Sequence, residues 1–288
     1  MYLLLLAIIY LAFISLGLPD SLLGAAWPTI YPAFDVPLSY MGVVSMIISG
    51  GTIVSSLMTE KLIKKFSVRV ITTASAFLTA AALLGFSASD GFIKLCLWGI
   101  PYGLGAGAID AALNNYVALH YNSKHMSWLH CFWGVGTIIS PYIMSYALTH
   151  TTWNNGYKTV SIIQFIIAAV LLLTFPVWKI NGNKQTENTE TTVLGIKGAL
   201  KIRGVPTLIT AFMAYCGAEA TAMFWTSSYL EGVHGVSKDR AAAFGSLFFI
   251  GITAGRFISG FISDKFGDNR MIRTGTIIAL CGTLLIAL

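Results

Sequence analysis

Long apolar runs, separated by short polar stretches, follow one another along almost the whole chain. Runs of roughly 18 or more residues with few charges are typical of membrane-spanning helices, whereas barrel strands would appear as short alternating stretches. The pattern therefore predicts an all-α membrane protein. The expected segments are Tyr2–Tyr31, Tyr40–Leu62, Val70–Phe86, Phe92–Leu119, Trp128–Leu148, Val160–Trp178, Val205–Leu230, Ala241–Ile262 and Ile272–Leu288.

One long polar stretch, Asn181–Thr192, interrupts this pattern after the sixth segment. It has no apolar periodicity, which is typical of a flexible linker. We therefore expect an N-terminal six-helix bundle over residues 1–180, a cytoplasmic linker over 181–204 and a partial C-terminal bundle of about three helices over 205–288. Because the ninth segment reaches the last residue with no polar cap, we expect a C-terminally truncated chain.

Two local patterns recur at an offset of about 200 residues. Phe66 in KKFSVR corresponds to Phe266 in DKFGDNR, and Asp20 in GLPD corresponds to Glu219 in GAE. Self-similarity at a fixed offset indicates an internal repeat. Asp20 and Glu219 are therefore expected at corresponding places in two halves of one fold.

The charge content supports a membrane location and gives an orientation. Charged residues make up 10% of the chain and mean hydropathy is +0.73, whereas soluble domains carry about 25% charged residues. Thirteen of the 18 lysines and arginines follow the second, fourth, sixth and eighth segments, and four lie in the opposite loops. The positive-inside rule then predicts a multi-pass protein of the plasma (inner) membrane with a cytoplasmic N-terminus.

Three carboxyl groups, those of Asp20, Asp110 and Glu219, lie near the centres of apolar segments. An acid at the centre of a spanning helix costs about 2.5 to 3.5 kcal/mol on insertion scales, so it persists where it faces a bundle interior or an aqueous cavity. Desolvation disfavours its charged form, which suits a group that binds and releases protons. The alternative is a neutral acid that hydrogen-bonds two helices together.

Asp110 and Asn114 are four residues apart and therefore face the same way on a helix. Together with Asn115 on the adjoining face, they form a polar patch suited to the hydroxyl groups of a sugar. The preceding glycines, 103, 105 and 107, are expected to permit close helix packing. We expect Asp110 to be the main proton-coupling residue, with Asp20.

Four further side chains have two readings each. His130 could join a proton relay or be a satisfied helix-end histidine. Gln164 could line a cavity or hydrogen-bond to another helix. Trp133 and Trp225 could stack on the apolar face of a sugar ring, or pack in the core.

Charged residues near the end of the eighth segment predict a cytoplasmic gate. Arg256 and Asp264 are eight residues apart on one helix face, and Arg270 follows in the basic loop. Such a network can hold two halves in one state and break in the other. The alternative is a set of ordinary loop charges.

These patterns resemble the major facilitator superfamily. In GRFISGFISDKFGDNR, residues Gly260, Asp264, Gly267 and Arg270 are similar to the cytoplasmic-loop signature of that superfamily, whereas the first-half copy carries Lys64 and Ser67 in place of the acid and the glycine. The resemblance implies the two-bundle helical fold of that superfamily, with about nine of twelve transmembrane helices present.

Within the superfamily, the chain looks most similar to fucose-permease-like sugar:proton symporters. The similar stretches contain Asp20 after a glycine, Asp110 and Asn114 after Gly105 and Gly107, and Glu219 after Tyr215 and Gly217. The resemblance implies that Asp20 and Asp110 act in protonation and sugar binding, and that Glu219 contacts the sugar.

The resulting expectation is a secondary active transporter that moves a small polar solute, most simply a sugar, with protons by alternating access. A drug or metabolite:proton antiporter of the same fold is an alternative, for which Gly136–Pro141 offers only a faint motif. A membrane-embedded enzyme lacks supporting motifs in this sequence, and an inactive truncated carrier is a third possibility. We expect a monomer in the lipid bilayer with no cofactor, metal or nucleic-acid partner; the four cysteines lie in apolar segments without ligand or disulfide spacing.

Overall fold

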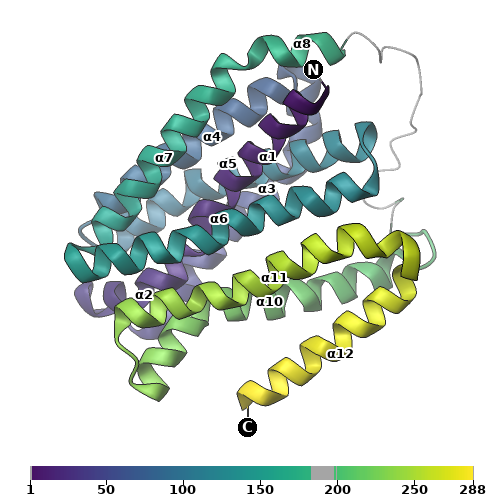
Figure 1. Ribbon diagram of the computed structural model, residues 1–288. Coiled ribbons are helices and arrows are strands. Elements are labelled where there is room, and N and C mark those ends of the chain that lie inside the picture. The colour runs from purple at the N-terminus through teal and green to yellow at the C-terminus, as the bar shows by residue number, and fades with distance from the viewer. Residues whose placement is uncertain (1, 183–197, 199, 288) are drawn as a thin grey trace.

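The computed structural model describes residues 2–182, 198 and 200–287 and contains only helices and connecting turns in those residues (Figure 1). The prediction of an all-α protein is confirmed. The helices are α1 (Tyr2–Asp20), α2 (Leu22–Ala33), η1 (Leu38–Tyr40), α3 (Met41–Phe66), α4 (Val68–Ser87), α5 (Phe92–His120), α6 (Ser123–His150), α7 (Trp153–Leu173), α8 (Phe175–Gly182), α10 (Val205–His234), α11 (Lys238–Phe266) and α12 (Asp268–Ala287).

Eight of the described stretches are long and apolar enough to cross a membrane, and they coincide with the first eight expected segments. The ninth expected segment is also helical, as α12. Most of the predicted linker, residues 183–197 and 199, lies outside the described residues.

Two expected segments are each divided into two helices, which the apolar pattern did not reveal. The first divides at Ser21, two residues after Pro19, and the sixth divides at Thr174, two residues before Pro176. Proline has no backbone N–H to donate to the carbonyl four residues earlier, and its ring crowds that carbonyl. The first break places Asp20 at the end of α1, where the helix direction changes.

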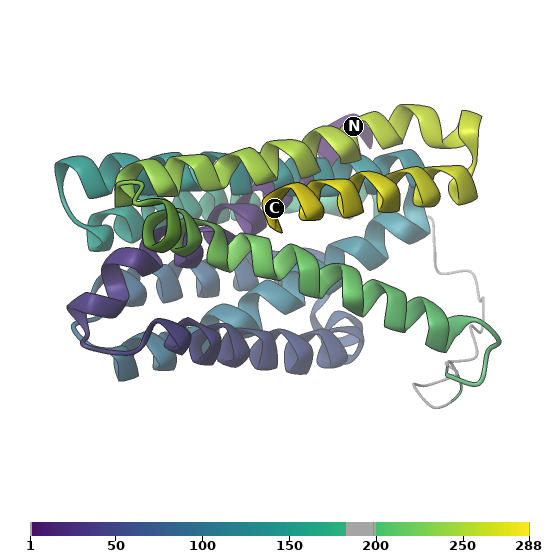
Figure 2. The ribbon, with the colours of Figure 1, turned by 90° about the horizontal axis from the view of Figure 1, so that it is seen from below.

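The helices form two groups. In the first, α4 packs against α5 and α7, α3 packs against α5, and α1 packs against α6. In the second, α10 and α11 lie side by side, and α11 runs along α6 in both views, with α12 beyond it (Figures 1 and 2). The large buried side chains Tyr157 and Phe13 belong to the first group, which therefore holds the main core.

Glycines permit the closest helix crossings of the first group. A Cβ atom at Gly103 or Gly107 of α5 would collide with the backbone of α3, and one at Gly105 would press on α4. The predicted packing role of these three glycines is confirmed. Gly17 of α1 and Gly136 of α6 likewise face the backbone of each other's helix, so that α1 and α6 lie in direct backbone contact.

The two copies of the loop repeat share a backbone feature. Ser67 between α3 and α4 has a φ of 68°, and Gly267 between α11 and α12 has a φ of 75°. Both corresponding positions therefore adopt the positive-φ region that favours glycine. This agreement supports the internal repeat that the sequence indicated.

Candidate functional site

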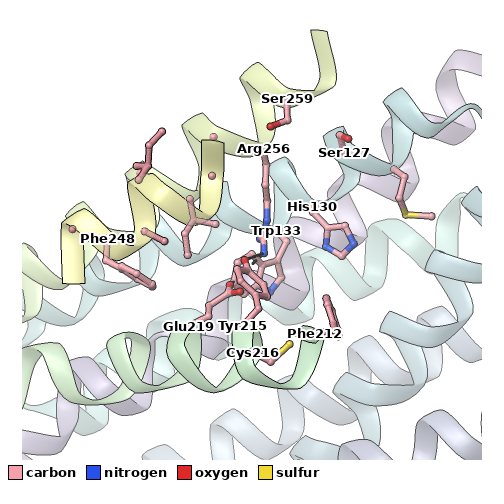
Figure 3. Close-up of a pocket in the computed structure, with 18 of the residues that line it drawn as sticks. Ser127, His130, Trp133, Phe212, Tyr215, Cys216, Glu219, Phe248, Arg256 and Ser259 are labelled. Atoms are coloured by element: carbon pink, nitrogen blue, oxygen red, sulfur yellow. Dashed lines mark hydrogen bonds and ion pairs between the residues drawn. The ribbon is translucent and has the colours of Figure 1, made fainter. Parts of the chain in front are cut away.

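A cavity of about 1020 Å³ lies between the two groups of helices. Helices α5 and α6 supply one side, and α10, α11 and α12 supply the other (Figure 3). Most of the lining is apolar. The polar and ionisable side chains in it belong to Asp110, Ser127, His130, Trp133, Tyr215, Cys216, Glu219, Arg256 and Ser259.

Arg256 of α11 reaches across the cavity toward α10. Its Nη2 lies 3.3 Å from Oε1 of Glu219 and 3.3 Å from the hydroxyl of Tyr215, to both of which it donates. Glu219 and Tyr215 are four residues apart on α10 and so present one face to Arg256. The side chains of Arg256 and Glu219 are 23% and 14% exposed, so the ion pair is largely removed from solvent.

Asp20, at the end of α1, is held by two donors from other helices. The hydroxyl of Tyr102 in α5 donates to Oδ1 at 2.6 Å, and Nε1 of Trp133 in α6 donates to Oδ2 at 2.8 Å. The neighbouring Ser21 donates to the carbonyl of Thr137, also in α6. The break after α1 is thus fixed to α6 on both sides of the peptide that joins Asp20 to Ser21.

Trp133 connects these two clusters. While its indole nitrogen donates to Asp20, its ring lies 4.8 Å from the guanidinium carbon of Arg256. A cation over a tryptophan face is attracted by the negative face of the ring. A continuous set of contacts therefore runs from Tyr102 through Asp20, Trp133 and Arg256 to Glu219.

Asp110 lines the cavity from α5 and accepts a hydrogen bond of 2.8 Å from Nδ2 of Asn114. The four-residue spacing thus brings the two side chains together, as predicted. Asn115, the third member of the expected patch, is exposed and is not among the lining residues.

The other sequence-predicted residues take different places. His130 lines the cavity, with its ring edge-to-face against Phe13. Gln164 is buried between α7 and α4, where its Nε2 donates to Oγ1 of Thr79, and it does not line the cavity. Trp225 packs against the core of the first group.

Two residues of the predicted gate, Arg256 and Arg270, have different surroundings. Arg256 makes its contacts in the cavity, as described above, and Arg270 is exposed near the start of α12. The side chain of Asp264 lies outside the described residues. The gate therefore stays a prediction.

The sequence did not point to the hydroxyl groups of Tyr102 and Tyr215 as parts of the site. Tyr102 follows Pro101 in an apolar helix, and Tyr215 was noticed only as part of a motif. Each contacts an intramembrane carboxyl or the arginine beside it. A tyrosine deep in an apolar segment, whose hydroxyl needs a partner when buried, was the available signal.

Comparison with curated proteins gives one relative of low identity. The chain is 24% identical over 283 residues to Bypass of stop codon protein 6 from Saccharomyces cerevisiae, with 89% of this chain and 56% of that protein covered. The chain thus spans about half the length of this relative.

Solved structures share the fold. A D-xylose-proton symporter matches with a TM-score of 0.66 and 12% identity, covering 91% of this chain and 69% of that chain. The xylose transporter XylE from E. coli, in a partially occluded inward-open conformation, matches with a TM-score of 0.59 and 16% identity over 91% of this chain and 73% of that chain. At such identities the likeness shows the fold alone.

The family model gives the broadest match. It is the model of the Major Facilitator Superfamily, and it matches residues 9–288, which include both groups of helices and every residue of the cavity. The match covers more than half of the chain, which is sufficient to assign the family. The match therefore shows that the chain belongs to the Major Facilitator Superfamily.

Proposed function

We propose that the protein is a secondary active transporter that moves a sugar together with protons by alternating access. The observation that carries the proposal is the cavity between the two groups of helices, into which Asp110, Glu219 and Arg256 project. Binding sites of secondary transporters lie at such an interface between repeats. Rocking of the two groups about this interface would expose the cavity to each side in turn.

The chemistry of the cavity suits a neutral polar solute. Its volume, about 1020 Å³, is at the upper end of the range of small-molecule sites, which is about 300 to 1,000 Å³. Trp133 and Phe248 offer aromatic surface, and Arg256 and Glu219 offer a donor and an acceptor. A sugar presents both an apolar ring face and hydroxyl groups that donate and accept.

The relatives support the same substrate class. A solved structure that shares the fold is described as a D-xylose-proton symporter, and another as a xylose transporter. The resemblance to fucose-permease-like symporters in the stretches around Asp20, Asp110 and Glu219 adds a second line of support. We assign the chain to that subgroup as part of the proposal.

Proton coupling is proposed for Asp110 and Asp20, with His130 in support. Asp110 and His130 both lie in the cavity wall, where a proton and a sugar could compete or cooperate. Asp20 lies one side chain behind the wall, in contact with the lining residue Trp133. Glu219, Asn114 and Trp133 are the proposed sugar contacts, because they lie in the wall or touch a wall residue.

The proposed setting is the plasma membrane, with the N-terminus in the cytoplasm and the protein as a monomer. The distribution of lysine and arginine supports this orientation. Residues 1–180 would form one bundle, 181–204 a cytoplasmic linker and 205–288 part of the second bundle.

Uptake into proteoliposomes tests the proposal. The purified chain is reconstituted, a pH gradient with an acidic exterior is imposed, and uptake of labelled D-xylose and L-fucose is measured. Accumulation that disappears with a protonophore is expected. Sugar that accumulates only when the gradient is reversed would indicate antiport, and no uptake of either sugar under any gradient would contradict the proposal.

Asp110→Asn tests the coupling residue, and Asp90→Asn is its matched control. Asp90 lies in the turn before α5, where it pairs with Lys94 and both side chains are exposed. Asp110→Asn should retain equilibrating exchange of sugar but lose gradient-driven accumulation, whereas Asp90→Asn should retain both. Full accumulation by Asp110→Asn would remove this residue from the coupling mechanism.

A further inference from the structure

Trp133 is in contact with ionisable groups of both helix groups at once. Its Nε1 donates to Oδ2 of Asp20 in α1 at 2.8 Å, and its ring lies 4.8 Å from the guanidinium carbon of Arg256 in α11. Figure 3 shows the indole beside the end of the Arg256 side chain, close to Glu219. One rigid side chain therefore separates a carboxyl group of the first group from the ion pair of the second.

The two carboxyl oxygens of Asp20 differ in whether they can carry a proton without losing their hydrogen bond. Oδ2 faces the indole N–H of Trp133, which can only donate, whereas Oδ1 faces the hydroxyl of Tyr102, which can donate or accept. A proton on Oδ2 would oppose the indole N–H. A proton on Oδ1 can be accepted by Tyr102 after its hydroxyl rotates, so the carboxyl can become neutral while Trp133 keeps its hydrogen bond.

Protonation of Asp20 at Oδ1 would still weaken the interactions that Trp133 makes. A hydrogen bond to a carboxylate is roughly twice as strong as one to a neutral acceptor. Negative charge at the N–H edge of the indole also strengthens the attraction between the ring face and a cation. Neutralising Asp20 should therefore weaken both the hydrogen bond between Trp133 and Asp20 and the cation–π contact between Trp133 and Arg256.

Other ionisable groups surround this path. Those near Asp20 come from α5 and α10, and those near Arg256 come from α6 and α10. They are Tyr102, Asp110 and Glu219 around Asp20, and His130, Cys131, Tyr215, Cys216 and Glu219 around Arg256. The α12 residues in the cavity wall, Gly275, Ile278, Ala279 and Gly282, carry no charge.

We propose that Trp133 is a positioning residue that transmits the charge state of Asp20 to Arg256, and so sets how firmly Arg256 is held beside Glu219. Tyr102 is the group that adapts to the proton, and Trp133 is the group that passes its effect across the interface. The inference deepens the proposed function and rests on it for its role in transport. It names the place where a proton bound by α1 alters the part of the cavity formed by α10 and α11.

A double-mutant cycle tests the transmission without any substrate. Asp20→Asn, Arg256→Gln and the double variant are compared with the parent by thermal unfolding of the purified full chain at roughly pH 8, where carboxyl groups are most ionised. The two changes should be non-additive by roughly 2 °C or more in the unfolding midpoint. The non-additivity should shrink as the pH is lowered toward roughly 4, because carboxyl groups with ordinary pKa values are then partly protonated and less charge remains to be transmitted.

The same double-mutant cycle in a Trp133→Phe background tests whether the coupling between Asp20 and Arg256 passes through Trp133. Phenylalanine keeps an aromatic face but has no N–H for Asp20, so the non-additivity should disappear. Trp128→Phe is the matched control, because Trp128 lies on the same helix and its Nε1 has no hydrogen-bond partner among the described residues. The cycle should be unchanged in that background.

Three outcomes would overturn the inference: additivity in the parent protein, non-additivity that survives Trp133→Phe, or an equal loss in Trp128→Phe. If Trp133→Phe does not fold, Trp133→Met, which also has no hydrogen-bond donor for Asp20, takes its place in the same comparison and carries the same expectation. Because the cycle uses no sugar and no pH gradient, its result is separate from that of the uptake experiment. A protein that transports neither sugar could still show the coupling.

Discussion

Nη2 of Arg256 in α11 lies 3.3 Å from Oε1 of Glu219 in α10, while Nη1 of the same guanidinium is buried without a hydrogen-bond partner among the described residues. The arginine is therefore only half satisfied by the protein. A buried N–H donor without a partner is costly, so Arg256 depends on Glu219 and Tyr215 for its stabilisation.

Removing the partner of Arg256 should destabilise the protein. In Glu219→Gln the guanidinium loses its counter-charge in a largely buried place, so the free energy of unfolding should fall by about 1 to 3 kcal/mol. Glu60→Gln is the control, because it breaks the pair with Lys64, whose partners are 69% and 58% exposed and should contribute little. Thermal unfolding measures both, and equal midpoints for the two variants would contradict the prediction.

The crossing of α1 and α6 should not tolerate a methyl group. A Cβ atom at Gly17 would collide with the backbone carbonyl of Trp133, which can move only if the helices separate. Gly17→Ala should therefore lower the free energy of unfolding by about 1 to 3 kcal/mol, as overpacking does. Because Asp20 and Trp133 are positioned by this crossing, transport should fall as well.

Gly217→Ala provides the comparison. Gly217 is the repeat counterpart of Gly17, but a Cβ atom there would meet no heavy atom within 4 Å. Alanine is the better helix former by about 1 kcal/mol, so this variant should unfold no earlier than the parent. A Gly17→Ala protein as stable as Gly217→Ala would show that the close approach of α1 and α6 does not contribute to the stability of the protein.

The helices could be predicted from the sequence because a spanning helix requires a long apolar run, which is a local property. The contact between Asp110 and Asn114 was predictable for the same reason, since four residues make one helical turn. The partners of Asp20 were not, because Tyr102 and Trp133 are 82 and 113 residues away and meet it only through helix packing.

Arg256 shows most clearly which contacts could not be predicted from the sequence. Its spacing from Asp264 along α11 suggested a partner two turns away, toward the end of the helix. In the structure its contacts are Glu219 and Tyr215 of the adjacent helix. Which face of α11 meets α10 depends on how the two helices rotate against each other, and spacing within one helix does not contain that information.

Gln164 should prove structural. It is 1% exposed, its Nε2 donates to Thr79, and its Oε1 has no hydrogen-bond partner among the described residues. Gln164→Met keeps the volume, loses one hydrogen bond and removes one unpaired oxygen, so the free energy of unfolding should change by no more than about 1 kcal/mol. Sugar exchange in proteoliposomes should be unchanged, and a large loss of exchange would return Gln164 to the binding site.

Ser67 occupies a backbone conformation that suits glycine. Its φ is 68° and its ψ is 154°, a region that residues with a Cβ atom enter at a cost of about 1 to 3 kcal/mol. The side chain makes no capping hydrogen bond to offset this cost. Ser67→Gly should therefore raise the free energy of unfolding by about 1 kcal/mol, after part of the gain is lost to the greater freedom of glycine in the unfolded chain.

Two further variants separate backbone strain from other effects of Ser67. Ser67→Ala removes the hydroxyl but keeps the Cβ atom, so it should give no gain in the unfolding midpoint. Gly267→Ala places a Cβ atom at the corresponding turn, where φ is 75°, and should lower the free energy of unfolding by about 1 to 2 kcal/mol. Opposite signs for Ser67→Gly and Gly267→Ala follow from one cause, since both turns require the same positive φ. A neutral result at Gly267 would mean that the two copies of the repeat do not share this backbone requirement.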